Sequence, residues 1–209
     1  MRSSRRFSNS APALLAGLLA ALPAWAASID TGFLEQPWPK ARTQETEVGR
    51  HAVQWRQRAD KREGIFAGVQ FVAPLDRQAV WDRANRYTDV GAMTPGVTAV
   101  RYVEQSERRQ VIQVDVRVLW KDFTLTFELE QDPPEAVRFK MVHPAIGEYR
   151  GICRFTERTG ASGTVTELLT WLKPSRPVPA RLVLLVERMA LLSAARRFLK
   201  ACEQQRKPG

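Results

Sequence analysis

The sequence is poor in histidine and cysteine, with two of each among 209 residues. Two cysteines cannot form the set of disulfide bonds that stabilises a small secreted domain. Together with two histidines they are also too few for a metal cluster with the usual ligands. Phosphate-binding loops, dinucleotide-binding glycine motifs, zinc-protease motifs and the serine-hydrolase motif are missing as well. We therefore expect no metal ion and no cofactor, and we assign no catalytic residue.

The sequence also lacks a hydrophobic run of the length that crosses a bilayer. The apolar run at residues 11–22 is well short of the ~20 residues that a transmembrane helix needs. It follows a start with three arginines and no acidic residue, and it precedes Ala24 and Ala26 in an A-x-A pattern. This order is typical of a secretory signal peptide. We expect cleavage near Ala26, removal of residues 1–26, and a periplasmic or secreted protein.

Composition places the rest of the chain among globular proteins. Hydrophobic residues make up 44% and charged residues 26% of the sequence, whereas disordered chains are poorer in apolar residues. The length fits one domain. Residues 27–50, with two glycines and two prolines, are predicted to form a loosely ordered lead-in. The predicted domain covers residues 51–205, and residues 206–209 form a tail.

Alternation of apolar and polar residues predicts a series of strands. A first pair lies at residues 51–57 and 65–71, although a basic amphipathic helix over 50–62 is an alternative for the first member. Two short helices are predicted after Pro74, at 74–85 and 87–93. The further predicted strands are 97–104, 109–120, 123–130, 136–141, 149–157 and 164–172.

The period of the pattern changes after the prolines at 174, 177 and 179. Residues 181–204 are predicted to form one long helix, which is apolar on nearly every side over 182–192. A helix without a polar face must be covered on most sides. Six to seven antiparallel strands, two short helices and this long helix indicate an α+β fold, in which the sheet packs one face against the helix.

Several short motifs occur in a characteristic order. The sequence VQFVAPLD at 69–76 is followed by VW at 80–81, then by YTD at 87–89 and PGV at 95–97. The strand YRGICRF at 149–155 precedes a glycine turn and the proline-led final helix. In this order and spacing the chain resembles the START, polyketide-cyclase and coenzyme-Q-binding superfamily, which has the helix-grip fold. The resemblance runs from about residue 51 to residue 203.

The resemblance implies a curved sheet that holds a hydrophobic ligand in a cavity under the long helix. Cys153 stands where members of the superfamily often have Trp, which affects the size of the cavity. Alternation on the last two strands suggests that Cys153 and Phe155 on one strand, and Glu167 and Trp171 on the next, face this cavity. The predicted cavity wall consists of Trp81, Trp120, Phe127, Phe139, Met141, Phe155, Glu167, Trp171, Leu185 and Met189.

Glu167 and His143 are the two candidates for acid–base chemistry. Glu167 could be a polar anchor, or an acid whose pKa is raised in a pocket without water. Alternatively, the strand is half exposed, and Glu167 lies at its solvated end or pairs with an arginine such as Arg188. His143 lies in a predicted loop before Pro144 and could be a general base, or simply a solvated histidine without partners.

Export would place Cys153 and Cys202 in an oxidising compartment, where a disulfide bond between them is allowed. They lie 49 positions apart, and the alternative is two small buried residues, one in a strand and one near the end of a helix. The sequence does not decide between these alternatives, because it does not give the distance between the two Cα atoms.

The formal net charge is +10, and basic residues gather near the C-terminus at Arg196, Arg197, Lys200, Arg206 and Lys207. Nucleic acid is not an expected partner of an exported protein. Peripheral contact with an anionic membrane surface would explain the charge, and so would an arginine-rich solvated surface. The oligomeric state is not predicted.

We therefore expect an exported domain that binds a lipid or another hydrophobic small molecule, for storage or transfer and without catalysis. A cyclase-like or hydrolase-like enzyme that uses the same cavity is the first alternative. A protein-interaction accessory of the cell envelope is the second.

Overall fold

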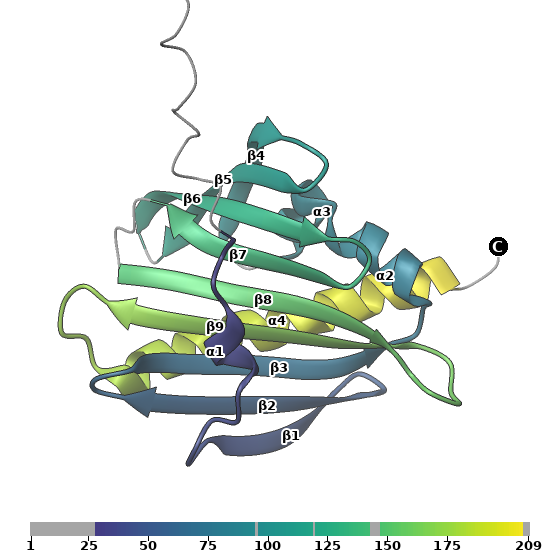
Figure 1. Ribbon diagram of the computed structural model, residues 1–209, viewed down its shortest axis with the longest axis horizontal. Coiled ribbons are helices and arrows are strands. Elements are labelled where there is room, and N and C mark those ends of the chain that lie inside the picture. The colour runs from purple at the N-terminus through teal and green to yellow at the C-terminus, as the bar shows by residue number, and fades with distance from the viewer. Residues whose placement is uncertain (1–27, 95, 119, 143–146, 207–209) are drawn as a thin grey trace, which may run out of the picture.

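A computed structural model describes residues 28–94, 96–118, 120–142 and 147–206 of the protein. Within these residues nine antiparallel strands form one curved sheet (Figure 1). The strands follow one another across the sheet in the order β1 (Arg42–Val48), β2 (His51–Asp60), β3 (Gly64–Ala73), β9 (Thr164–Pro174), β8 (Gly147–Glu157), β7 (Ala136–Val142), β6 (Lys121–Asp132), β5 (Arg109–Val118) and β4 (Val97–Gln105).

In the described part of the chain four helices accompany the sheet: α1 (Gly32–Glu35), α2 (Arg77–Ala84), α3 (Tyr87–Met93) and α4 (Ala180–Arg206). The helix α2 begins where the Asp76 side chain accepts a hydrogen bond from the backbone N–H of Ala79 at 2.8 Å. The helices α1 and α4 lie on opposite faces of the sheet (Figure 1). None of the helices in the described ranges is both long and apolar enough to cross a membrane.

The predicted α+β helix-grip fold is confirmed, with nine strands in place of six to seven. Residues 51–60 form a strand and not the alternative amphipathic helix. The unpredicted strand β1 lies at the sheet edge, and all of its side chains except Thr46 and Val48 are exposed. Hydrophobic alternation cannot identify such a strand, because neither of its faces has an apolar pattern.

The expectation of a loosely ordered lead-in at residues 27–50 is wrong. Within this segment β1 adds a strand at the sheet edge, and α1 and Trp38 lie on the outer, convex face of the sheet. Leu34 and Trp38 pack there against Phe66, Ile152 and Leu169, and all five side chains are buried. The sheet therefore has apolar side chains on both faces, which matters for the site below.

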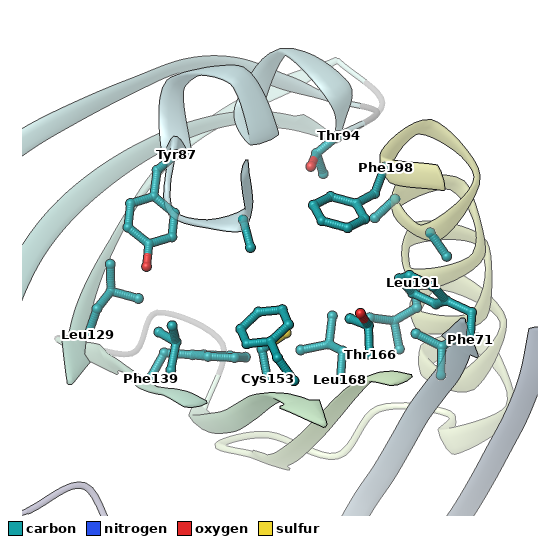
Figure 2. Close-up of a pocket in the computed structure, with 16 residues that line it drawn as sticks. Phe71, Tyr87, Thr94, Leu129, Phe139, Cys153, Thr166, Leu168, Leu191 and Phe198 are labelled. Atoms are coloured by element: carbon teal, nitrogen blue, oxygen red, sulfur yellow. The ribbon is translucent and has the colours of Figure 1, made fainter. Parts of the chain in front are cut away.

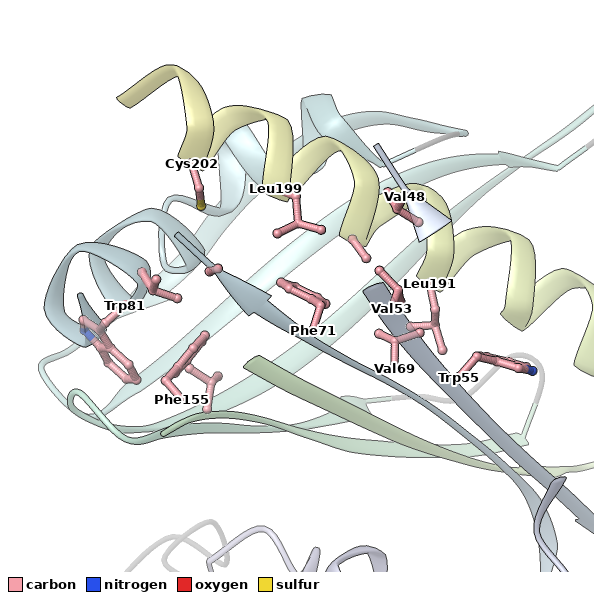
Figure 3. Close-up of a cluster of buried hydrophobic side chains, with 14 of the residues drawn as sticks. Val48, Val53, Trp55, Val69, Phe71, Trp81, Phe155, Leu191, Leu199 and Cys202 are labelled. Carbon is pink, nitrogen blue, oxygen red and sulfur yellow. The ribbon is translucent and has the colours of Figure 1, made fainter. Parts of the chain in front are cut away.

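The main core lies on the other, concave face, between the sheet and the second half of α4 (Figure 3). Phe71 and Val69 of β3 face Leu191 and Leu199 of α4 across this interface. Trp81 of α2 closes one end of the core, since its ring stands edge-on to that of Phe155 with the centroids 5.8 Å apart. The same interface contains the cavity described next.

Candidate ligand cavity

An apolar cavity of about 230 Å³ lies between the concave face of the sheet, α4 and the segment of α2 and α3 (Figure 2). It is partly open to solvent. Ligand sites are commonly about 300–1,000 Å³, so this cavity is somewhat smaller than the usual site and suits a small ligand. Its wall consists of Val69, Phe71, Ala84, Tyr87, Thr94, Leu129, Val137, Phe139, Cys153, Phe155, Thr166, Leu168, Leu191, Ala194, Ala195 and Phe198.

The register of β8 and β9 decides which of their side chains reach the cavity. Cys153 pairs with Leu168, and Phe155 pairs with Thr166. Residues that are directly opposite in an antiparallel pair share a face, so these four side chains all point into the cavity. Gly151 allows the Phe139 ring of the neighbouring strand to lie directly over its backbone, because a Cβ atom at this position would overlap the ring.

The helix α4 contributes two large and two small side chains to the cavity wall. Leu191, Ala194, Ala195 and Phe198 line the cavity, and their spacing places them on one face of the helix. The two alanines leave the volume that larger side chains would fill. Tyr87 and Thr94 line the cavity from the start and the end of α3, with Tyr87 across the cavity from α4 and Thr94 beside Phe198 (Figure 2).

The cavity is uncharged, since its described wall contains no Asp, Glu, Lys, Arg or His. Its polar atoms belong to Tyr87, Thr94, Cys153 and Thr166. Burial raises the pKa of Cys153 to about 12, with the charge of Glu167 adding to the effect, so the thiol is protonated at neutral pH. Burial also raises the pKa of Tyr87 far above its ordinary value.

Tyr87 belongs to a small polar network at one end of the cavity. Its hydroxyl donates to Oδ1 of Asn85 at 2.6 Å, and Nε2 of Gln131 donates to the same oxygen at 2.8 Å. A second, weaker contact of 3.4 Å joins Gln131 Nε2 to the Tyr87 hydroxyl. These bonds fix the phenol and leave its oxygen able to accept a further hydrogen bond.

Glu187 lies one turn of α4 before Leu191, outside the cavity wall. The hydroxyl oxygen of Thr170 on β9 lies 3.5 Å from Oε2 of this half-buried carboxyl group. Burial raises the pKa of Glu187 to about 7. Near neutral pH it therefore places partial negative charge between the helix and the sheet, beside Tyr149.

Of the predicted wall residues, the structure places Phe139 and Phe155 in the cavity wall. Trp81 lies behind the wall against Phe155, and Phe127 packs against Phe139 with ring centroids 6.4 Å apart. Met141 is buried in β7, two positions after Phe139, and does not line the cavity. Contact of any of these residues with a ligand stays a prediction.

The predicted inward orientation of Glu167 and Trp171 is wrong. Both residues lie on the convex face, where Glu167 pairs with Arg56 at 2.7 Å and also with Arg154. Trp171 packs against Phe33 of α1, with ring centroids 5.2 Å apart. The phase of β9 was misjudged because α1 and Trp38 cover the convex face, so that apolar side chains occur on both sides of this strand.

Trp120, Leu185 and Met189 are also misplaced by the sequence-based prediction. Trp120 lies in the turn between β5 and β6 and is 80% exposed. Leu185 and Met189 lie outside the cavity wall and are 52% and 55% exposed. A helix that is apolar all round presents several faces, and the pattern alone does not tell which face packs on the sheet.

The structure answers the question of the disulfide bond but not that of His143. His143 lies outside the described residues. Cys153 and Cys202 are both free thiols, so the disulfide alternative is not realised. Cys153 lines the cavity on β8, whereas Cys202 is buried near the end of α4. Among the described residues no group of three or more His, Cys, Asp or Glu side chains could hold a metal ion.

Several wall residues were missed, above all Tyr87, Thr166, Leu168 and Phe198. A signal for two of them existed in the sequence. Once Phe155 is taken as inward, the turn after residue 157 sets which residues of the next strand lie opposite, and these are Thr166 and Leu168. Tyr87 and Phe198 depend on how the helices dock and have no comparable local signal.

Comparisons with known proteins agree with this architecture. The family model described as polyketide cyclase / dehydrase and lipid transport matches residues 73–199. No curated protein sequence matches the chain.

Three solved structures show the similarity. The Zhui aromatase/cyclase from Streptomyces sp. R1128 is 18% identical with a TM-score of 0.59, over 68% of this chain and 95% of that one. A STAR-related lipid transfer protein from Xanthomonas axonopodis (fragment 25–204) is 11% identical with a TM-score of 0.63, over 78% and 99%. Human STARD10 is 11% identical with a TM-score of 0.63, over 85% and 81%. At these identities the likeness shows the fold alone.

Proposed function

Because the chain belongs to the polyketide cyclase / dehydrase and lipid transport family, we propose that it binds a hydrophobic small molecule or lipid in its cavity without transforming it. The observation that carries the proposal is the uncharged cavity of about 230 Å³ between the sheet and α4. Sites for small molecules are concave, mainly apolar and furnished with a few polar groups. This description fits a wall whose polar members are a phenol, a thiol and two threonines.

An enzymatic role has less support from the wall. General acid–base catalysis needs a group whose pKa lies near the working pH. The ionisable groups of the described wall are Tyr87 and Cys153, and burial raises the pKa of both. Glu167, the carboxylate considered for this role, lies outside the cavity. The aromatase/cyclase among the similar structures keeps a cyclase as the second candidate.

Native mass spectrometry of the gently purified chain tests the binding proposal. We expect a fraction of the protein to carry a bound molecule of a few hundred daltons. This molecule should dissociate on collisional activation and should be extractable into organic solvent.

We also propose that the protein is exported and cleaved after Ala26. The same spectrum, taken on protein from the periplasm of a Gram-negative host, tests this proposal. A chain that starts at Met1 in that fraction would contradict the cleavage, and a ligand-free spectrum together with no binding in a lipid screen would contradict the binding.

We also propose that the protein docks on an anionic membrane surface through the first half of α4. Leu182, Leu185, Val186 and Met189 are 49–57% exposed, and their spacing places them on one face of the helix. A contiguous exposed apolar patch of this kind marks an interaction site. We refer to these four residues as the α4 stripe.

Positive charge beside the α4 stripe points to an anionic bilayer as the partner. The residues that line a groove next to it include its acidic member, Asp60, which pairs with Arg58, and the basic residues Lys40, Arg42, Arg181 and Arg188. Among the described residues, none of these four has an ion-pair partner. The N-terminus of α4 adds positive potential, since its first turn contains no acidic residue. An apolar helix face flanked by basic side chains is typical of helices that lie in a membrane interface.

The docking proposal predicts charge-dependent binding to vesicles. The chain that begins at Ala27, which contains every described residue, should sediment with vesicles of phosphatidylglycerol and phosphatidylcholine and much less with phosphatidylcholine alone. Arg181→Gln/Arg188→Gln should lower the partition coefficient roughly 30-fold, because each basic side chain near the surface contributes about 1 kcal/mol. Added salt should weaken binding as well.

Arg196→Gln/Lys200→Gln is the matched control, since it removes the same charge from the basic cluster at the other end of α4. We expect it to bind nearly as well as the unmodified chain. Loss of binding in this variant alone would move the contact to the C-terminal cluster. A stable dimer that leaves both kinds of vesicle unbound would show that the α4 stripe contacts a second copy of the chain.

A further inference from the structure

Thr166 is a buried wall residue whose hydroxyl has no hydrogen-bond partner among the described residues. Thr166 is only 3% exposed, and its hydroxyl oxygen lies on the cavity side of β9 (Figure 2). Buried polar groups in folded proteins almost always have a partner, so an unpaired one needs an explanation. Its neighbours in the wall include Val69, Phe71 and Leu168, whose side chains offer no acceptor or donor.

Two other threonines on the same face of β9 show how unusual this hydroxyl is. Thr164 donates to the carbonyl oxygen of Leu75 at 2.9 Å, and Thr170 donates to that of Ala67 at 3.2 Å. Both hydroxyls are thus satisfied by the neighbouring chain. Thr166, between them, is the one of the three that faces open volume. A polar group of a bound molecule would satisfy it.

The charge of the surroundings limits what this group can be. The described wall offers no cation to a carboxylate or a phosphate, and burying an unpaired anion is costly. Glu187, one helical turn beyond the wall, would repel a negative charge further. The thiol of Cys153 and the phenol of Tyr87 are compatible with neutral partners.

We infer that the Thr166 hydroxyl hydrogen-bonds to a neutral oxygen of the ligand, so the cavity selects hydrophobic molecules with a hydroxyl or carbonyl group over hydrocarbons and over anions. This inference rests on the proposed ligand-binding function and narrows its ligand class. Fatty-acid carboxylates and phospholipid headgroups are thereby excluded from the cavity itself.

Three bicyclic probes of nearly equal size test the selection. Naphthalene, 2-naphthol and 2-naphthoate are titrated into the chain that begins at Ala27, with binding followed by fluorescence. We expect 2-naphthol to bind about tenfold more tightly than naphthalene, which is the contribution of one hydrogen bond. The anion 2-naphthoate should bind more weakly than either. In Thr166→Val, naphthalene and 2-naphthol should bind with nearly equal affinity.

Thr164→Val is the matched control, because it removes a hydroxyl from the same strand face outside the cavity wall. It should leave the preference for 2-naphthol unchanged. Equal binding of naphthalene and 2-naphthol by the unmodified chain, or a preference that survives Thr166→Val, would overturn the inference while the cavity still binds. Failure of all three probes to bind would instead contradict the proposed function.

Discussion

Replacing Cys153 by Trp should abolish ligand binding while the protein stays folded. The Cys153 side chain points into the cavity from β8, opposite Leu168 and close to Val137 of β7. An indole at this position would occupy a large part of the cavity of about 230 Å³.

We expect binding of 2-naphthol to fall roughly 100-fold or more, because the probe and the indole cannot occupy the same volume. The melting temperature should fall little or rise, since the indole fills space that is empty of protein atoms. Cys153→Ser is the matched control and should retain binding within about tenfold, because it changes polarity with almost no change in volume. Binding that persists in Cys153→Trp would place the ligand elsewhere.

Phe155→Ala should cause the largest loss of stability among the wall substitutions. The Phe155 residue is only 2% exposed, and its ring stands edge-on against Trp81 of α2. Replacing the ring by a methyl group removes its contact with Trp81 of α2 and enlarges the existing cavity. The surrounding side chains cannot fill the additional empty volume. Substitutions of this type cost about 3–5 kcal/mol. For a domain of this size that corresponds to a melting temperature lower by roughly 10 °C.

Phe123→Ala is the comparison, because Phe123 of β6 is 37% exposed. Its loss should cost under ~1 kcal/mol. Denaturant unfolding of both variants measures the difference. Equal destabilisation by the two substitutions would contradict the assignment of Phe155 to the link between α2 and the sheet.

The elements of the fold could be predicted from the sequence because most strands here have one dominant apolar phase. Strands β4 to β9 and helices α2 to α4 lie within a few residues of the predicted ranges. The strand β1 was missed since its exposed, polar sequence has no apolar face. Its strand character depends on pairing with β2, a tertiary effect.

The cavity could be predicted less completely, and for a physical reason. Apolar side chains occur on both faces of β9. Leu169 and Trp171 are covered on one face by the lead-in segment, and Leu168 lines the cavity on the other face. The phase of such a strand is set by its register with β8, which composition does not record. Glu167 was misassigned for the same reason, since its arginine partners lie on strands distant in sequence.

The long helix shows a similar limit. Leu185 and Met189 were predicted to line the cavity, whereas the helix residues of the described wall include Leu191 and Ala195. Leu185 and Met189 lie in the first half of the helix, where the apolar side faces solvent. The pattern predicts that a helix needs covering, but not whether the sheet or an external surface covers it.

Native mass spectrometry of two forms purified side by side decides whether the cavity between the sheet and α4 is the ligand site. We expect the unmodified chain to carry a small hydrophobic molecule and Cys153→Trp, folded to the same degree by circular dichroism, to carry none. The same adduct on both forms, at the same occupancy, would contradict this expectation.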